Sequence, residues 1–594
     1  MLWKLKGTRG LWAAEVASAA SVRGIEWLRD TVFQVHIQGR DRAVRIGRSS
    51  EGPARLFTAE SAQAESAQAV SAQAVSAQAR CEASMRLLDA EHRAFVTDYR
   101  FDEDILAIKA VAGSGKTTTL LNLCAKNPGK RVLYIAFNKA LIDDIRAKAA
   151  DRGLRNVKPM TFDALVYQEA VARRATTASR APSTVTSSTQ TSSTGTSSTG
   201  TSSTIDQDMM AMGFPTLEIV DLKPHSLGRA LPWLEDKPWA VKDHYVRAFG
   251  DFCRQTRYRE PGPMAPGKPL LEAMWKETRA GRLNTFAGLR KLAQVDHWFR
   301  GRLSADYDCV FIDEAQDFDP IMLDILLMDA GIPKIFVGDP MQEIYGWRGC
   351  INAFARLPPS TTLTVEFYTT FRMGNPACRA ICGLFPGSTC RMIPGGCSAQ
   401  RESHLHAPVW GQAMKAPDPE QKRVWLFRTW RCLLEEAARV GEKKEIWIHG
   451  FAAQMTLMRA LHRKLSKCKR SLTKAEEDEF SDDLPRYLLS LSHADLENLI
   501  AAIEGNLAPD AASARVVMYT IHAYKGLEDD VVVVYNDIDP VKDEKLLYVA
   551  VTRGRREIFL EPRKLPPARG HSASARASAA AATSKITRFF GQDE

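Results

Sequence analysis

The sequence predicts an α/β protein in which helices cover both faces of parallel sheets. Continuous apolar runs alternate with helical stretches, and such runs are typical of strands that are buried on both faces. Four of these runs lie at residues 132–137, 310–312, 335–337 and 531–534. A small-residue loop also joins an apolar run at 105–108 to a helical run at 118–124. With 594 residues, 45% of them hydrophobic, the chain is long enough for several domains.

The loop at residues 110–117 has the sequence Ala-Val-Ala-Gly-Ser-Gly-Lys-Thr, with Ala110 where the general pattern has its first glycine. Strand, small-residue loop and helix in this order are the layout of a phosphate-binding loop, whose backbone N–H groups surround nucleotide phosphates. We expect Lys116 to reach the phosphates of ATP and Thr117 to hold Mg²⁺. The predicted nucleotide-binding residues of this loop are Ala112, Gly113, Ser114, Gly115, Lys116, Thr117 and Thr118.

Two adjacent carboxylates, Asp313 and Glu314, end the apolar run at 310–312. A chance Asp–Glu pair on a protein surface is merely solvated. At the end of a buried strand, in a chain that also has a phosphate loop, the pair favours catalysis. Asp313 is then placed to hold Mg²⁺, and Glu314 to polarise the water that attacks the terminal phosphate.

A third segment, residues 337–349, follows another apolar run and combines an amide with aromatic and basic side chains. Gln342 is suited to sense the terminal phosphate of a nucleotide. Tyr345, Trp347 and Arg348 offer rings and a cation, and aromatic faces stack on nucleic-acid bases at roughly 1–3 kcal/mol each. Alternatively Trp347 packs in the core, although the glycine and arginine beside it favour an exposed ring. A segment that joins a nucleotide sensor to a base platform indicates a nucleic-acid motor.

Together these motifs resemble those of superfamily 1 DNA helicases of the UvrD/Rep type, and most closely the F-box DNA helicase branch. The resemblance covers roughly residues 84–562. It implies two RecA-like P-loop domains with helical insertion subdomains, with ATP and Mg²⁺ as cofactors. It also implies an ATP-dependent DNA helicase or translocase that moves 3′→5′ on single-stranded DNA. Single-stranded DNA and single-/double-strand junctions are the implied partners, in DNA repair, recombination or replication.

Further segments match motifs of the same family at residues 134–140, 161–165, 370–372, 520–528 and 546–553. Arg372 and Arg553 then lie in the second domain and reach the terminal phosphate only when the two domains close. The implied catalytic or nucleotide-contacting residues beyond the loop are Asp313, Glu314, Gln342, Arg372, Glu528 and Arg553. The implied DNA contacts are Phe137, Asn138, Thr161, Phe162, Tyr345, Trp347, Arg348, Thr520 and His522.

Two positions depart from the family pattern. His92 stands where a glutamine is expected to read adenine, and one imidazole cannot make the paired hydrogen bonds of an amide. Asp163 stands where a histidine is usual, and a carboxylate there would repel a DNA phosphate. We still expect His92 to contact the nucleotide.

The resemblance and two low-complexity tracts predict the domain organisation. Five-residue repeats at 61–79 and 186–204 cannot bury enough apolar surface to offset chain entropy, so both are expected to be linkers or disordered loops. The expected parts are an N-terminal segment at 1–83, domain 1A at 84–164 and 301–340, insertion 1B at 165–300 with a disordered Ser/Thr tract at 183–204, domain 2A at 341–451 and 506–562, a reduced insertion 2B at 452–505, and a disordered tail at 563–594.

The tail contains Ile586, Phe589 and Phe590 at the i, i+3, i+4 spacing of a short apolar plug. It resembles the interaction box of sliding-clamp (PCNA) partners, although Thr583 replaces the usual leading glutamine. A stray apolar end is the alternative. The first 60 residues contain no convincing F-box.

Composition sets the remaining bounds. Lys and Arg (80) outnumber Asp and Glu (70), which permits a polyanionic partner, and no apolar run is long enough for a membrane span. The 11 cysteines lack the spacing of a disulfide scaffold and indicate a reducing compartment. We expect a nuclear or viral DNA-replication location, and the basic first 24 residues also permit organellar targeting. One loose cluster is either a zinc site or a set of incidental thiols: Cys378, Cys382, Cys390 and Cys397.

Two other functions stay open at this point. One is an RNA-directed motor, which a comparison of RNA and DNA as ATPase activators would separate from a DNA motor. The other is a catalytically weak, clamp-bound scaffold that keeps the fold. The intact lysine, carboxylates and arginines of the nucleotide motifs argue against the scaffold.

Overall fold

The computed structural model describes two separate units of the chain, residues 1–79 and 80–594. In the first unit the described part is an antiparallel strand pair, β1 (Phe33–Ile37) with β2 (Arg40–Val44). Both low-complexity tracts and the clamp-box residues Ile586, Phe589 and Phe590 lie outside the described residues. The described ranges are 33–37, 40–44, 82–101, 104–180, 217–261, 268–385, 391–395, 402–407, 417–440, 445–468, 472–473, 476–477, 480 and 483–561.

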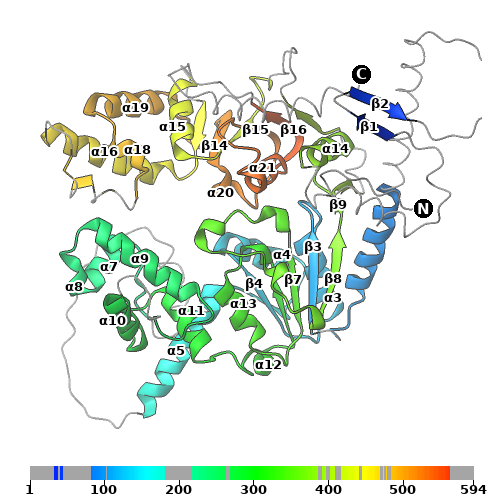
Figure 1. The fold of residues 1–594 in the computed structure, drawn as a ribbon, viewed down its shortest axis with the longest axis horizontal. Coiled ribbons are helices and arrows are strands. Elements are labelled where there is room, and N and C mark those ends of the chain that lie inside the picture. Colours follow the sequence, from blue (N-terminus) through cyan, green and yellow to red (C-terminus); the bar gives the residue numbers. More distant parts are fainter. Residues whose placement is uncertain are drawn as a thin grey trace, which may run out of the picture. The chain divides into compact units, whose positions relative to one another are not determined.

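The first sheet of the larger unit has six parallel strands in the order β5-β4-β6-β7-β3-β8 (Figure 1). We call this sheet with its covering helices lobe 1. Its strands are β3 (Ile105–Ala110), β4 (Val132–Ala136), β5 (Val157–Thr161), β6 (Cys309–Ile312), β7 (Lys334–Gly338) and β8 (Thr362–Phe367).

Alternate side chains of each strand enter different cores on the two faces of this sheet. In β4, Tyr134 packs with helices α3 (Lys116–Lys126) and α4 (Lys139–Asp151), whereas its neighbour Ile135 packs with α13 (Pro320–Leu327). Every residue of β4 is therefore buried, which explains why its sequence is continuously apolar. The structure confirms the predicted parallel sheet with helices on both faces.

A helical segment separates β5 from β6 within lobe 1. Its fully buried Trp275 and Phe249 belong to the same core as the underside of the sheet, so the segment packs on lobe 1 rather than standing alone. Its helices are α5 (Phe162–Arg180), α7 (Pro224–Ala230), α8 (Pro232–Glu235), α9 (Trp239–Arg254), α10 (Lys268–Arg279), α11 (Phe286–Val295) and α12 (Leu303–Asp306).

The second sheet is also six-stranded and parallel, in the order β11-β16-β15-β12-β14-β13. We call it lobe 2 together with α14 (Asn375–Leu384), α15 (Trp430–Arg439), α20 (Ile521–Tyr524) and α21 (Glu544–Val551). Its strands are β11 (His404–His406), β12 (Arg423–Phe427), β13 (Ile446–Ile448), β14 (Val516–Thr520), β15 (Asp529–Val534) and β16 (Gly554–Leu560).

The segment between β13 and β14 is helical, with α16 (Phe451–Cys468), α18 (Arg486–Leu489) and α19 (His493–Asn506). Apolar side chains of α16 and α19 share one core with a face of the second sheet. None of the helices in the described ranges is long and apolar enough to cross a membrane.

One predicted domain boundary is wrong. Residues 341–451 were expected in the second domain, but β8 pairs in parallel with β3 over its whole length and completes the first sheet. The chain passes to lobe 2 after β9 (Thr369–Thr370), with α14, and returns once to pair β10 (Ile393–Pro394) in parallel with β9. Edge strands such as β8 carry polar residues on their exposed positions, so the sequence around 362–367 lacks a continuous apolar run.

Candidate nucleotide site and nucleic-acid interface

The predicted phosphate loop joins β3 to α3, with the helix starting at Lys116. Gly113 and Gly115 have φ angles of 71° and 79°, in the left-handed region that favours glycine. A Cβ atom at Gly113 would lie 2.6 Å from the Cβ of Arg372, so the loop and residues 370–372 can approach only because this residue is glycine. The Phe371 N–H donates to the Gly113 carbonyl at 2.8 Å.

The loop contains a buried polar atom that lacks a partner in the described structure. The Oγ of Ser114 is shielded from solvent and makes no hydrogen bond. Buried hydroxyls are normally satisfied, so an orphan at the start of a helix indicates a place for a ligand oxygen. The loop therefore fits the phosphate group of a nucleotide.

The carboxylate pair lies directly beside the loop. Asp313 Oδ2 accepts hydrogen bonds from Thr117 Oγ1 at 3.2 Å and from the buried Tyr134 hydroxyl at 2.7 Å. Lys116 Nζ lies 3.9 Å from Glu314 Oε1. The two side chains predicted to hold Mg²⁺, Thr117 and Asp313, are thus in contact.

The two carboxylates differ in their electrostatic surroundings. Burial and the adjacent Glu314 charge raise the pKa of Asp313 above its usual range. Burial also acts to raise the pKa of Glu314, but Lys116 and Lys525 outweigh it and leave that pKa well below the usual range. Glu314 is therefore held ionised, the form that can orient and polarise water.

Glu314 occupies a strained backbone conformation. Its φ of 52° is one of three positive values among non-glycine residues in the described ranges. The Gln316 amide donates to the Glu314 carboxylate, and Gln316 Oε1 accepts from the Asp339 N–H at 3.1 Å. Strain of this kind persists only where surrounding contacts impose it, and it is typical of functional sites.

Gln342 and Arg553 meet at the boundary between the lobes. Arg553 is 2% exposed, and its Nη2 donates to Gln342 Oε1 at 3.2 Å. Gln342 Nε2 donates in turn to Asp339 Oδ2 at 2.9 Å. Burial, and then the nearby Arg372 charge, lower the pKa of Arg553 to about 9. A buried guanidinium close to a second one indicates a position for an anion.

Arg372 does not lie simply in the second domain, as the sequence predicted. Its backbone follows β8 and β9 and adjoins Gly113 of lobe 1. Its side chain reaches lobe 2, where Nε donates to Glu528 at 2.5 Å and Nη1 to the Thr552 carbonyl at 2.7 Å. Arg372 starts from lobe 1 because β8 belongs to the first sheet and Arg372 follows β8 by only five residues.

Both lobes line one cavity of about 850 Å³. Lobe 1 contributes the phosphate loop, Glu314 and Gln342, and lobe 2 contributes Glu528 and Arg553. Phe371 also lines the cavity, with 46% of the residue exposed. The sequence did not indicate this role, although Phe371 lies within the matched motif at 370–372. An exposed ring beside a phosphate loop is suited to stack on a nucleotide base.

Two other residues were missed because their partners are distant in the sequence. Lys525 of lobe 2 donates to both oxygens of Asp317 in lobe 1, at 2.7 and 2.5 Å, and to the Gln342 carbonyl at 2.7 Å. Burial raises the pKa of Asp317 to about 7, and the Lys525 charge opposes this rise. This buried ion pair joins the lobes beside the cavity.

Aromatic side chains of both lobes gather next to this ion pair. We call Phe137, Tyr345, Trp347 and His522 the aromatic patch. Phe137 stacks on Tyr345 with ring centroids 5.3 Å apart, and Trp347 makes an edge contact with His522 at 6.4 Å. Trp347 is 68% exposed, which excludes the alternative that it packs in the core. The Arg348 guanidinium lies 4.8 Å from the Trp347 ring centroid.

The imidazole of His522 contacts the backbone next to Tyr345. Its Nε2 lies 3.3 Å from the Ile344 carbonyl, and burial lowers the pKa of His522. The ring is therefore a neutral surface at physiological pH, suited to contact a base more than a phosphate.

His92 is not brought to the cavity. Its Nδ1 lies 2.8 Å from the carbonyl and 3.1 Å from the N–H of Glu366, in β8. The ring thus ties the helix at 82–97 to the edge strand of the sheet and does not line the cavity, and its contact with the nucleotide stays a prediction. Arg93, one residue on, instead donates to the Ser114 carbonyl at 3.0 Å and reaches the phosphate loop.

Two further positions behave differently from the expectation. Phe162 is 1% exposed and packs edge-on against Phe318 at 6.1 Å, so its side chain is a core residue and cannot contact DNA. Asp163 pairs with Arg290 at 3.5 Å, and this partner offsets the repulsion of phosphate that the sequence suggested.

Three of the predicted DNA contacts use their side chains as helix caps. Thr161 Oγ1 accepts from the Ala164 N–H, Asn138 Oδ1 from the Leu141 N–H, and Thr520 Oγ1 from the Ala523 N–H. These caps orient the turns on which the predicted contacts lie. Of the cysteine cluster, Cys378 is buried and Cys382 half-buried, both as free thiols, and Cys390 and Cys397 lie outside the described residues.

Comparisons with known proteins agree with the motifs. Residues 273–355 match the family model of the UvrD/REP helicase N-terminal domain. The F-box DNA helicase protein 1 of Schizosaccharomyces pombe is 27% identical over 300 residues, which are 50% of this chain and 32% of that protein. The F-box DNA helicase 1 of Gallus gallus is 26% identical over 526 residues, 77% of this chain and 47% of that protein. The chain thus spans less than half the length of these relatives.

Two solved structures were also matched, the PRRSV helicase and the arterivirus nonstructural protein 10 helicase. Their sequence identities are 11% and 12%, and they cover 80% and 77% of this chain. The matches cover 56% and 59% of those chains, with TM-scores of 0.30 and 0.26. The family match and the curated relatives confirm the resemblance inferred from the motifs.

A first prediction tests the reassignment of Phe162 to the core. Phe162→Ala should lower the free energy of unfolding by about 3–5 kcal/mol, because it removes a buried aromatic ring, and Phe162→Leu should cost much less. Urea unfolding of the full chain measures this. Phe137→Ala, in the half-buried patch, is the matched control and should weaken binding to single-stranded DNA with little loss of stability. A stable Phe162→Ala variant with weakened DNA binding would contradict the reassignment.

A second prediction concerns the buried pair between the lobes. Lys525→Met should destabilise the protein by about 3–5 kcal/mol, since it leaves the Asp317 carboxylate buried without a partner. The double variant Asp317→Asn/Lys525→Met should recover part of that loss. Thermal unfolding of the two single variants and the double variant gives the coupling, and strictly additive effects would show that the pair is not coupled.

Proposed function

We propose that this chain is an ATP-dependent DNA helicase or translocase. Its motifs and relatives indicate the UvrD-like superfamily, and within it the F-box DNA helicases. One observation carries the proposal. A single cavity is lined by the phosphate loop of lobe 1 and by Glu528 and Arg553 of lobe 2. Next to it lies the aromatic patch, to which both lobes contribute and in which Trp347 is exposed.

Nucleotide binding is supported by the residues that surround the cavity. The phosphate loop offers N–H groups, Lys116 and the unpartnered Ser114 hydroxyl to phosphate oxygens. Phe371 offers a ring to the base. Thr117 and Asp313, which touch through their oxygens, are the residues that would hold Mg²⁺. When bound, this ion would neutralise charge on the phosphates.

The chemistry then follows from the charges of the chain. Glu314, held ionised by its lysine neighbours, orients the attacking water. Lys116, Arg372 and Arg553 stabilise the charge that develops on the transferred phosphoryl group, and such arginines contribute about 10³–10⁵ in rate. Arg372 pairs with Glu528 in this structure, so its guanidinium must exchange that carboxylate for phosphate.

Coupling to the track is supported by a short path through the chain. Gln342 contacts Arg553 with its side chain, and its carbonyl accepts from Lys525. Lys525 Nζ also lies 5.0 Å from the ring centroid of Tyr345. Tyr345 follows Gln342 by three residues in the chain. A change in the distance between the lobes on hydrolysis therefore reaches the aromatic patch directly. Repeated opening and closing would move the patch along a strand.

Single-stranded DNA is the proposed track, because bases must be unstacked to lie on exposed rings such as Trp347. Movement 3′→5′ is the direction that the UvrD-like resemblance implies. The names of the relatives, both F-box DNA helicases, support action on DNA. A nuclear location and a role in repair, recombination or replication stay predictions. Binding of a sliding clamp through Ile586, Phe589 and Phe590 stays a prediction.

The third prediction tests the motor. ATP hydrolysis by the wild type should be stimulated by single-stranded DNA, and Glu314→Gln should lower turnover by about 10²–10⁴ while nucleotide still binds. Lys116→Ala should lose nucleotide binding as well. Phosphate release measures turnover, and Glu420→Gln, which changes an exposed glutamate, is the matched control.

The same assay separates the competing functions. Stimulation by RNA but not by DNA would replace the DNA motor with an RNA-directed one. ATP hydrolysis that ignores both nucleic acids, or that is absent in the wild type, would contradict the motor and favour a scaffold.

The fourth prediction tests the patch. Trp347→Ala should weaken binding to single-stranded DNA by about 1–3 kcal/mol and reduce the base pairs unwound per ATP, because a stacking surface is lost. Tyr258→Ala, at another exposed aromatic residue, should leave both quantities unchanged. Fluorescence anisotropy and a strand-displacement assay with phosphate detection give the two values. Unchanged unwinding per ATP in Trp347→Ala would argue against the stacking role.

A further inference from the structure

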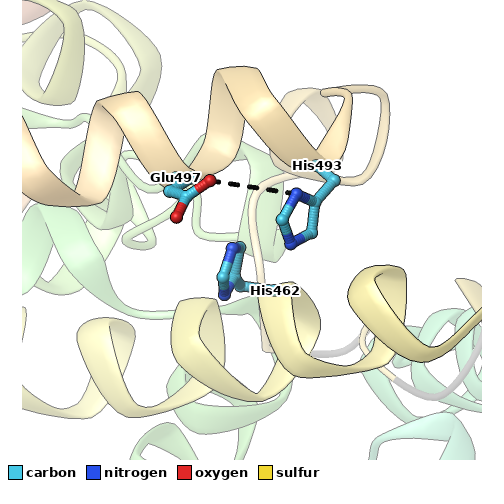
Figure 2. A group of neighbouring side chains, drawn as sticks. All are labelled: His462, His493 and Glu497. Atoms are coloured by element: carbon cyan, nitrogen blue, oxygen red, sulfur yellow. Dashed lines mark ion pairs between the residues drawn. The ribbon is translucent and has the colours of Figure 1, made fainter. Parts of the chain in front are cut away.

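Three metal-ligating side chains meet between two helices, away from the residues that line the nucleotide cavity (Figure 2). His462 lies on α16, and His493 and Glu497 lie one turn apart on α19. One ligand atom from each of the three lies within 4.8 Å of the other two. Figure 2 shows the two rings one above the other, with the Glu497 carboxylate beside them.

The contacts of this trio leave imidazole nitrogens unsatisfied. The rings of His462 and His493 stack with centroids 4.2 Å apart. The Nε2 atoms of both are buried and have no hydrogen-bond partner in the described part of the chain. Within the trio, His493 Nδ1 lies 3.9 Å from a carboxylate oxygen of Glu497, which is longer than a hydrogen bond. Buried imidazole nitrogens are normally paired, so this arrangement calls for a further partner.

The chemistry of the three side chains selects the kind of partner. Imidazole nitrogens and carboxylate oxygens are both metal ligands. Two imidazole rings and a carboxylate are ligands for zinc and its neighbours among divalent transition ions, whereas Mg²⁺ and Ca²⁺ prefer oxygen ligands alone.

We propose that His462, His493 and Glu497 form a Zn²⁺ site that ties α16 to α19. Zinc holds N and O ligands at about 2.0–2.2 Å, which places neighbouring ligand atoms about 3.3 Å apart. Small rotations of these side chains close the set, because His462 and His493 are only half-buried and Glu497 is exposed. Three protein ligands leave the fourth position to water.

The ion would add to a contact that already exists. Leu461 and Leu465 of α16 share a buried core with Leu496 and Ile500 of α19, so the backbone that presents the ligands is ordered by packing. A preformed arrangement lowers the ordering cost of binding. The site would thus brace the helical segment between β13 and β14 without contributing to the nucleotide cavity.

The experiment uses the full chain after removal of metal by a chelator. Titration with Co²⁺ should give the visible absorption of a four-coordinate ion, and Zn²⁺ should displace it in a one-to-one ratio. Zn²⁺ should also raise the melting temperature of the wild type. His462→Gln, His493→Gln and Glu497→Gln should each weaken Zn²⁺ binding by at least about tenfold, as the loss of a direct ligand exceeds the loss of an outer-shell partner.

Other histidines and cysteines of the chain could also bind Co²⁺, so a control is required. His244→Gln changes an exposed histidine on α9 and should bind Zn²⁺ as the wild type does. Circular dichroism of the metal-free variants checks the fold, and Glu497→Gln, at an exposed position, keeps the test valid if a histidine variant is unstable. Equal Zn²⁺ affinity and stoichiometry in the wild type and Glu497→Gln would overturn the proposal, as would the absence of a four-coordinate Co²⁺ spectrum.

Discussion

The pairing of buried charges across the two lobes is the interaction on which the rest of the site depends. Lys525 and Asp317 come from different sheets and are both almost fully buried. Each of these ions would cost several kcal/mol to bury alone, so neither lobe can bury its charge without the other. Lys525 also donates to the Gln342 carbonyl, and both Lys525 and Gln342 line the cavity. The shape of the site therefore depends on the distance between the two lobes.

Close packing of the loops at the strand ends supports this arrangement. The carboxyl ends of parallel strands leave loops at one edge of each sheet, and open α/β sheets bind their ligands there. Glycine permits the closest approaches: a Cβ at Gly338 would lie 2.2 Å from Gln316 Oε1. Gln316 in turn holds the strained Glu314, so the positive φ of this predicted catalytic residue is supported by contacts with the end of a neighbouring strand.

The parts of the chain that extend beyond the two sheets have separate tasks. The segment from Asp339 to Trp347 connects the cavity to the aromatic patch within a few residues, because Gln342 lines the cavity and Trp347 belongs to the patch. The helices between β13 and β14 share no residue with the cavity, yet they contain the histidine–glutamate trio at a helix–helix contact. A brace there would stiffen a segment whose helices are joined by apolar packing and by the ion pair of Arg459 with Glu504.

The sequence by itself determined the fold class, the phosphate loop, the carboxylate pair and the aromatic segment. Each of these features lies within one short stretch of sequence. An apolar strand followed directly by small or charged residues predicts the chemistry of the loop at its end. The tertiary structure alone decided that β8 completes the first sheet, that His92 serves the sheet edge and that Phe162 lies in the core. It also decided the partners of Lys525 and His462, because Lys525 meets a carboxylate 208 residues away and His462 meets its partners on another helix. Contacts between segments that are distant in the sequence follow from how the helices and strands pack. The spacing of residues within one segment does not determine that packing.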